Sequence, residues 1–188
     1  MLLKRQLEME TTNLMVGDVV WFTLKDGEEV EAMAMKKEED GMVFAFIDCL
    51  AEERPMIDKN GVTLTEWMND ELLKKLPVDL MKRLVVFEDG TYLRLMTQKE
   101  VFGGNSWDAK EEPDTVEQFE PMKIRRNRIA DLSKGSDEWT WWWLSNKTWL
   151  RDVATSTYFA IVYNDGNSLA GTASNSLGVR PAFKISDL

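Results

Sequence analysis

The sequence predicts an α+β fold in which strands occupy both ends of the chain and helices lie between them. Residues 16–48 alternate charged and apolar side chains around Asp-Gly pairs, a pattern typical of hairpins. Residues 62–84 change to a helical spacing of apolar positions, and residues 139–185 return to strand-like runs. With 188 residues, 44% of them hydrophobic and 30% charged, the chain has enough apolar material for one folded domain over residues 1–188.

The first predicted element is an antiparallel meander of three strands within residues 17–48. Asp26-Gly27 and Asp40-Gly41 mark its turns, and Asp-Gly pairs favour two-residue hairpin loops with positive φ. Cys49 follows in an apolar run, where a single cysteine is expected to be a buried thiol.

The middle of the chain carries helix start and stop signals. Thr63 followed by Glu66 has the spacing of a capping box and opens the first predicted helix. Pro77 ends that helix and can open a second, short one over residues 78–84.

A strand pair around residues 87–96, with Asp89-Gly90 at its turn, is expected next. Residues 97–103 (TQKEVFG) repeat the capping-box spacing and predict a short helix that ends at Gly103. Residues 104–121 are polar and acidic with two prolines, which favours a surface excursion over a core element.

The last predicted elements are two strands, YFAIVY and GVRPAFKI, with a turn at NDGN (residues 164–167). Pro181 is expected at a strand end or edge because it cannot donate to a ladder. Four tryptophans also cluster in this part of the sequence: Trp139, Trp141, Trp142 and Trp143. They are either a platform on which a sugar or a base stacks or side chains that fill the core.

Charge and composition exclude several classes of function. A net charge of −10 repels nucleic acid and anionic membrane surfaces. The basic stretch KIRRNRIADLSK (residues 123–134) is either an anion patch or a helix face set against the acidic residues before it.

The chain has no histidine, which excludes Ser-His-Asp and Cys-His catalysis within it, and we expect no metal, no cofactor and no catalytic residue. Glu111, Glu112 and Asp114 fit solvated charges in an acidic loop better than catalytic carboxylates.

One segment uses a restricted set of amino acids. From Asp152 to Val179 the chain has no Lys, Glu, Gln, Met or Trp, although these residues are common elsewhere in it. A loop and edge-strand region is naturally rich in Ser, Gly, Asn and Thr, so its structure alone is one explanation of this composition.

A second explanation comes from a family resemblance. The frame WWLSNK (142–147), Ser156, Phe159-Ala160, Val162, Gly166, Ala173-Ser174 and GVRPAF (178–183) resembles the C-terminal segment of diversity-generating retroelement variable proteins of gut phages and bacteria. The resemblance covers most of the chain, through residues 40–56, 68–77, 97–103 and 122–130. It implies a C-type-lectin-like (formylglycine-generating-enzyme-like) fold, with the N-terminal meander at residues 16–48 and the variable segment at residues 139–185.

The resemblance also implies an origin for the restricted composition of this segment. In such proteins a retroelement mutates adenines of a template, and diversified codons of the AAC type cannot encode Lys, Glu, Gln, Met or Trp. These are the five residue types missing between Asp152 and Val179.

Twelve positions are the diversified, ligand-binding residues by this resemblance. They are Tyr158, Ile161, Tyr163, Asn164, Asp165, Asn167, Leu169, Ala170, Gly171, Thr172, Asn175 and Leu177. We expect them to form one exposed patch above buried Phe159, Val162 and Phe183, with Arg180 and Trp142 supporting the fold. Strict alternation would place Ile161 and Tyr163 on the same face as Phe159, so exposure of these two residues requires a bulge near Phe159.

The resemblance predicts a non-catalytic display protein that binds a protein or glycan on a target cell, with other phage tail proteins as further partners. The calcium-binding tripeptides of sugar-binding lectins do not occur, and Cys49 alone does not supply the active-site cysteines of a formylglycine-generating enzyme. An enzyme of the same fold acting on a cell-envelope polymer, and a structural protein without a variable site, are the alternatives. The N-terminus lacks an apolar run long enough for a signal peptide, so we expect cytoplasmic synthesis and association with a virion.

Overall fold

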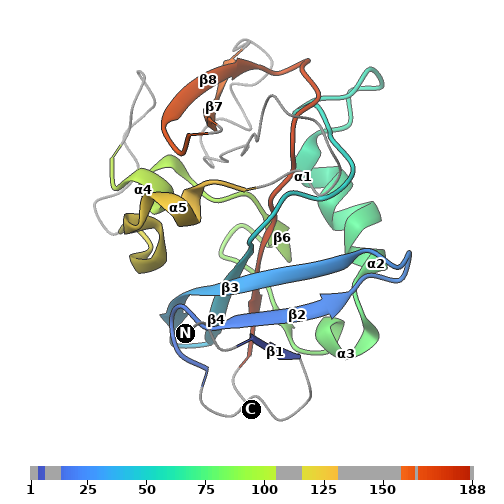
Figure 1. The fold of residues 1–188 in the computed structure, drawn as a ribbon. Helices are drawn as coiled ribbons and strands as arrows, with labels where there is room; N and C mark the ends of the chain where they lie inside the picture. The colour runs from blue at the N-terminus through green and yellow to red at the C-terminus, as the bar shows by residue number, and fades with distance from the viewer. Residues whose placement is uncertain (1–3, 7–13, 105–115, 131–157, 164, 187–188) are drawn as a thin grey trace.

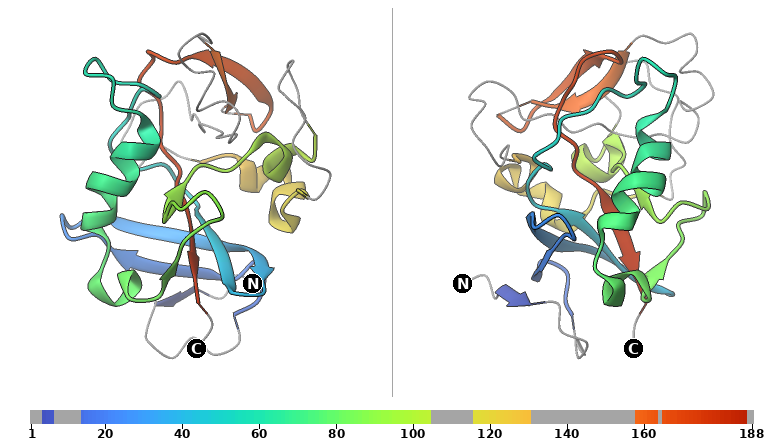
Figure 2. Two further views of the ribbon diagram at one scale, coloured as in Figure 1. Left: turned by 180° about the vertical axis from the view of Figure 1, so that it is seen from behind. Right: turned by 90° about the vertical axis from the view of Figure 1, so that its right-hand side faces the viewer.

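The computed structural model describes residues 4–6, 14–104, 116–130, 158–163 and 165–186, and its architecture is α+β, as predicted (Figure 1). Seven strands form one sheet in the order β1-β2-β3-β4-β9-β5, and β6 also pairs with β9. A separate hairpin of β7 and β8 stands at the end of the molecule opposite β1, which the two further views confirm (Figure 2).

The predicted N-terminal meander is confirmed. It consists of β2 (Val19–Thr23), β3 (Glu29–Glu38) and β4 (Gly41–Phe46), paired antiparallel in sequence order. β1 (Lys4–Gln6) adds a parallel strand at the outer edge of β2. The register between β3 and β4 shifts at Met35, a buried residue between Ala34 and Lys36, as at a β-bulge.

The loop at Asp26-Gly27 differs from the predicted two-residue turn. The Gly27 N–H donates to Leu24 O at 2.9 Å and the Leu24 N–H donates to Glu28 O at 2.8 Å, so residues 25–27 form a three-residue loop. Gly27 has a φ of +92°, which places it in the left-handed region at the last loop position. The same pair of backbone bonds recurs around residues 59–61, 88–90 and 164–166. The prediction was therefore right about the turn residue and wrong about the loop length.

Gly41 is needed for a different reason from the one predicted. It is the first residue of β4 and does not have positive φ. A Cβ added there would lie 2.1 Å from the carbonyl oxygen of Ile185 on the neighbouring strand β9. Glycine at this position therefore permits β9 to approach, and the turn does not require it.

The central helices begin where the sequence predicts, but the second, predicted over residues 78–84, ends at Met81. Thr63 accepts a hydrogen bond from the Glu66 N–H, and Glu66 accepts one from the Thr63 N–H, which completes the capping box of α1 (Leu64–Trp67). The helix continues through the π-helical turn η1 (Met68–Leu72) and α2 (Leu73–Lys75). Pro77 precedes α3 (Val78–Met81), as expected.

A second capping box, made by Thr97 and Glu100, opens α4 (Gln98–Phe102), and Gly103 ends it with a φ of +77°. The two-residue strands β5 (Leu84–Val85) and β6 (Leu93–Arg94) each pair with β9 (Ala182–Ile185). The turn predicted at Asp89-Gly90 is confirmed, but the strand pair predicted around residues 87–96 is wrong, because β5 and β6 pair with β9 and not with each other.

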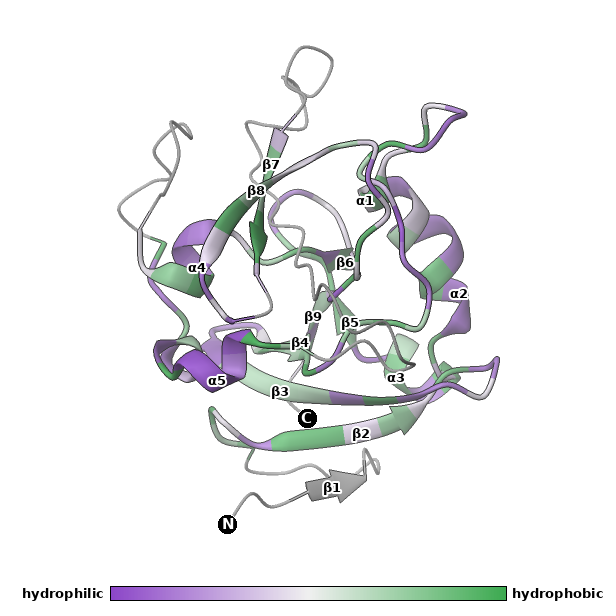
Figure 3. Ribbon diagram, turned by 45° about the horizontal axis from the view of Figure 1, so that its top comes forward, coloured by the Kyte–Doolittle hydropathy of each residue, from purple (hydrophilic) through white to green (hydrophobic). Residues whose placement is uncertain are grey.

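The sheet is covered on both faces. One core lies between the sheet and the helices α1 to α3, and its aromatic centre is Phe22, Phe44, Phe46 and Phe183. A second core lies on the other face, against α4 and the 3₁₀ helix η2 (Glu120–Lys123). In Figure 3, β2 and β4 are coloured mainly hydrophobic, whereas α2 and α5 (Arg125–Arg128) are coloured mainly hydrophilic.

The end of the predicted surface excursion belongs to this second core. Phe119 is 3% exposed, and Pro121 and Met122 are buried. The prediction for residues 104–121 was therefore wrong at its C-terminal end, because the buried Phe119 and Pro121 outweigh the polar composition around them. Residues 105–115, which include Glu111, Glu112 and Asp114, lie outside the described residues.

Candidate ligand-binding surface

The twelve predicted binding positions lie on and after one hairpin. β7 (Tyr158–Val162) pairs antiparallel with β8 (Ser168–Thr172), and the register runs without interruption from Tyr158 opposite Thr172 to Val162 opposite Ser168. The bulge expected near Phe159 is therefore not formed. The turn predicted at residues 164–167 is confirmed, because the Gly166 N–H donates to Tyr163 O and the Tyr163 N–H donates to Asn167 O, both at 2.8 Å.

Helix α5 (Arg125–Arg128) supports the turn of this hairpin. The Nε of Arg125 donates to the backbone oxygen of Asp165 at 2.7 Å, and its Nη2 lies 3.4 Å from the Asp165 carboxylate. Gly166 packs so closely that an added Cβ would lie 3.1 Å from Arg125 and 3.2 Å from Ile129. Gly166 also has a φ of +81°, so both space and conformation favour glycine.

The chain leaving β8 is held by a second set of main-chain contacts. The Met56 N–H donates to Ala173 O at 3.0 Å, Arg54 and Leu177 exchange two bonds of 2.9 and 3.1 Å, and the Leu50 N–H donates to Val179 O at 2.9 Å. Residues 173–181 therefore run antiparallel to residues 46–56 and connect the hairpin to the sheet. Pro181 directly precedes β9, at a strand end as predicted.

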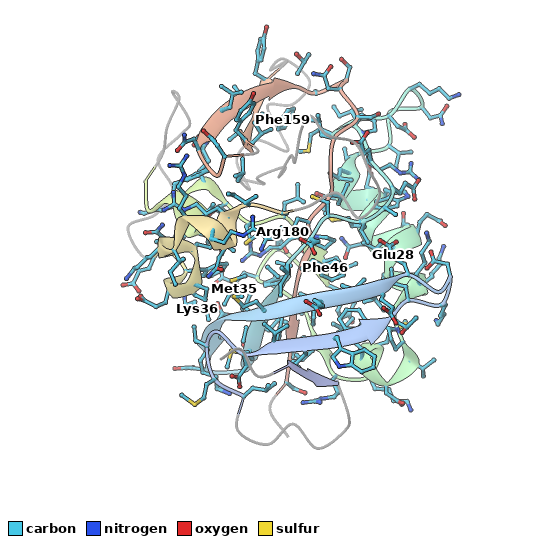
Figure 4. All side chains as sticks on the ribbon, in the orientation of Figure 1. Glu28, Met35, Lys36, Phe46, Phe159 and Arg180 are labelled. Atoms are coloured by element: carbon cyan, nitrogen blue, oxygen red, sulfur yellow. The ribbon has the colours of Figure 1, made fainter. Side chains whose placement is uncertain are left out.

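Arg180 is the buried centre of this connection (Figure 4). It is 2% exposed, its Nε donates to the carbonyl oxygen of Phe46, and its Nη1 donates to the oxygen of Asn127 at 3.1 Å. Burial lowers the pKa of Arg180 well below its usual value. The contacts join the end of β4 to α5, the helix that supports the hairpin turn, which agrees with the predicted role of Arg180 in the fold.

Eight of the twelve positions are accessible. Four are exposed: Tyr158, Asp165, Asn167 and Asn175. Four are half-buried: Tyr163, Leu169, Ala170 and Thr172. Asn164 lies outside the described residues, as do the tryptophans at 139 and 141–143 and therefore the predicted role of Trp142.

Three positions do not have the predicted exposure. Ile161 is fully buried, Leu177 is 4% exposed, and Gly171 is buried opposite Phe159. Ile161 shares the first core with Phe159, while Ala160 and Val162 lie in the second core, so β7 is buried on both faces. Without a bulge, strand alternation places Ile161 on the same face of β7 as the buried Phe159.

The buried framework expected beneath the surface is confirmed. Phe159 is 2% exposed, and Val162 and Phe183 are fully buried. The four exposed positions lie at the two ends of the hairpin. Tyr158 and Asn175 lie at the open end, where the Asn175 N–H donates to the oxygen of half-buried Thr172 at 3.0 Å, whereas Asp165 and Asn167 lie at the turn.

Two arginines that shape this region were not singled out by sequence. The Arg54 guanidinium lies 4.3 Å from the centroid of the Trp67 ring and 2.6 Å from a carboxylate oxygen of Glu52, next to its backbone pairing with Leu177. Arg125 belongs to a stretch considered as an anion patch or a basic helix face. In the structure it supports the turn, and its neighbour Lys123 pairs with Glu120 at 2.5 Å. The Lys123–Glu120 pair agrees with a basic face set against the acidic residues before it, whereas the basic charges contained no signal for Asp165 as the partner of Arg125.

The buried position of Ile161 gives a direct test. Ile161→Ser should lower the free energy of unfolding by about 2 kcal/mol, because it removes apolar contacts and buries a hydroxyl. Tyr158→Ser, on the same strand but 60% exposed, should change it by about 0.5 kcal/mol or less. Urea unfolding of both variants measures the difference, and equal effects would contradict the assignment of inner and outer positions.

Among the described residues, no group of three or more His, Cys, Asp or Glu side chains is placed to hold a metal ion. In the same parts of the chain, no helix is long and apolar enough to cross a membrane. Cys49 is buried, as predicted.

No family model, no curated protein and no solved structure matches the chain.

Proposed function

We propose that the protein is a non-catalytic display protein of C-type-lectin-like fold whose β7–β8 hairpin presents a ligand-binding surface diversified by a retroelement. Its ligand lies on a target cell, and its setting is a phage tail or a similar adhesion structure. The proposal rests on the resemblance of the C-terminal segment and on the five residue types missing between Asp152 and Val179.

One structural observation supports this proposal most. Besides the packing of β7 in both cores, the turn of the hairpin and the chain that leaves β8 are held through backbone groups, by Arg125 at Asp165 O, by Met56 at Ala173 O and by Arg54 at Leu177. Bonds to backbone oxygens persist whichever side chain the position carries. Substitution of the accessible side chains therefore costs little stability, which a diversified surface requires.

The three buried positions refine the proposal. If Ile161 and Leu177 are diversified, folded variants should retain apolar residues there, because a polar side chain in the core is costly. Gly171 should remain small, because it is buried opposite Phe159. The freely variable surface is then the eight accessible positions.

Sequencing many copies of this gene from one source population tests the proposal. Substitutions should concentrate at adenine-derived positions in the codons for the twelve residues and spare Phe159, Gly166 and Arg180. A reverse transcriptase gene nearby, with a template repeat matching codons 145–183, should accompany them. The meander codons 16–48 are the internal control. Substitutions spread evenly over both regions, without such a template, would contradict the proposal.

A further inference from the structure

We infer that Arg125 is a constant ligand-binding residue beside the variable turn, and that the residue at position 165 decides whether Arg125 can bind a carboxylate of a protein ligand. This inference rests on the proposed function of the β7–β8 hairpin. Arg125 lies outside the segment with restricted composition, whereas Asp165 lies within it. Because Asp165 pairs with Arg125 here, this chain is a variant whose turn disfavours an acidic ligand group.

The side chains of Arg125 and Asp165 lie on one surface because they are direct neighbours. The Arg125 Nη2 lies 3.4 Å from the Asp165 carboxylate, and the two side chains are 58% and 45% exposed. The next residue, Gly166, lies equally close, since an added Cβ there would be 3.1 Å from the Arg125 Cγ. A ligand group that covers the side chain at position 165 therefore also meets the guanidinium.

The position of the Arg125 guanidinium does not depend on the side chain at position 165. Its Nε donates to the backbone oxygen of Asp165 at 2.7 Å, and every residue supplies such an oxygen. The guanidinium is therefore held in place before a ligand arrives, so binding through it loses less conformational entropy. Its remaining N–H groups suit a carboxylate, which accepts two parallel hydrogen bonds from arginine.

Position 165 can change charge without changing the turn. The Asp165 carboxylate accepts hydrogen bonds from the Asn167 N–H at 2.9 Å and from the Asn167 side-chain amide at 2.7 Å. Asparagine retains an oxygen for the backbone N–H but carries no charge. AAC encodes asparagine and GAC encodes aspartate, so one adenine substitution in a codon of the diversified type exchanges the two. Diversification can thus neutralise or release Arg125.

The charge of the chain favours a protein carboxylate over an acidic polysaccharide. A net charge of −10 repels a polymer that carries a carboxylate on every repeat. A folded protein presents single carboxylates among charges of both signs. Nearby cations are also engaged within the molecule, since Lys123 pairs with Glu120 and Arg128 lies over the Phe102 ring. One released guanidinium therefore matches one carboxylate better than a row of them.

Displayed libraries of the full chain test this inference without knowledge of the natural ligand. One library keeps Asp165, a second carries Asp165→Asn, and both are randomised at the accessible positions nearest the turn: Tyr163, Asn167, Leu169 and Ala170. Each library is selected against α-lactalbumin, an acidic protein, against lysozyme, a basic protein of the same fold, and against polygalacturonate, an acidic polysaccharide. A third library with Asp79→Asn is the matched control, because it removes the same charge beside Lys82 on α3, near the opposite end of the molecule.

The Asp165→Asn library should yield about fivefold or more binders of α-lactalbumin than the parent library, because the guanidinium is no longer neutralised. The Asp79→Asn library should differ from the parent by less than about twofold. In several independent α-lactalbumin binders, Arg125→Gln should raise Kd about fivefold or more at low salt, and less at high salt. Reversal of Asp165→Asn in the same binders should also weaken binding, and it leaves Arg125 in place.

The same Arg125→Gln substitution in lysozyme binders measures any loosening of the turn, and unfolding midpoints show whether the variants remain folded. Equal weakening on both protein probes would assign Arg125 to turn support alone and overturn the inference. Unchanged Kd on α-lactalbumin would also overturn it, as would a gain of binders on polygalacturonate alone. Failure to obtain binders from any library on any probe would instead count against the proposed function.

Discussion

Arg180→Ala should lower the free energy of unfolding by about 4 kcal/mol, the largest single effect expected in this protein. The substitution removes charge-assisted hydrogen bonds to the carbonyl oxygens of Phe46 and Asn127, and each such bond contributes roughly 1.5–3 kcal/mol. It also leaves a cavity, because Arg180 is among the largest fully buried side chains. Urea unfolding followed by tryptophan fluorescence measures the change.

Two further variants keep this prediction testable if Arg180→Ala fails to fold. Arg180→Met retains much of the buried volume but lacks the donors, so it should remain destabilised by about 2 kcal/mol or more. Lys59→Ala, which removes an exposed cation, should have an effect within about 0.5 kcal/mol. An Arg180→Met variant as stable as the parent protein would show that the hydrogen bonds contribute nothing to stability.

Arg180 also connects to the proposed binding surface. It joins β4 to α5, and α5 carries the Arg125 that holds the hairpin turn through Asp165 O. Loss of Arg180 should therefore loosen the turn as well as the core. Faster amide hydrogen exchange at Gly166 and Asn167 in Arg180→Met would report this local change, since local opening can precede global unfolding.

Gly41→Ala should lower the free energy of unfolding by about 3 kcal/mol. The added methyl group would lie 2.1 Å from Ile185 O and 2.9 Å from Ile185 C, and both atoms belong to the backbone of β9. Backbone atoms cannot move aside as a side chain can, so β4 and β9 would have to separate where they pair. Thermal or urea unfolding of the variant provides the measurement.

Gly104→Ala is the matched control for this variant. Gly104 also lacks positive φ, and a Cβ there would meet nothing within 4 Å. Its replacement should therefore leave stability within about 0.5 kcal/mol or raise it slightly, because alanine loses less entropy on folding. Equal effects of the two substitutions would show that the contact with β9 does not explain the need for Gly41.

The local elements could be predicted because their causes are local. The capping boxes at Thr63 and Thr97, the stop at Pro77 and the turn glycines other than Gly41 act over three or four residues, and the structure confirms each of them. The length of the Asp26-Gly27 loop was mispredicted because a two-residue and a three-residue hairpin loop both favour Asp and Gly. Only the hydrogen bonds around Leu24 and Gly27 distinguish the two.

The candidate site was predicted less completely. The sequence correctly assigned Phe159, Val162 and Phe183 to the interior and Tyr158, Asp165, Asn167 and Asn175 to the surface. It failed at Gly171, Ile161 and Leu177, which the family resemblance assigned to the surface; at Ile161 this expectation was given more weight than strand alternation. Ile161 and Leu177 pack in the core together with residues distant in sequence, such as Leu64 and Phe44.

The sequence by itself determined the order of elements, the helix starts and stops and the composition of the C-terminal segment, because each depends on neighbouring residues. Only the tertiary structure decided that β9 lies beside β4, that Gly41 must be small, and that Arg180 and Arg125 support the hairpin. These contacts join residues 40 to 144 positions apart. Composition and periodicity carry no information about such partners. Which acceptor a donor meets, and which position must stay small, is decided only when the chain packs and brings distant residues next to each other.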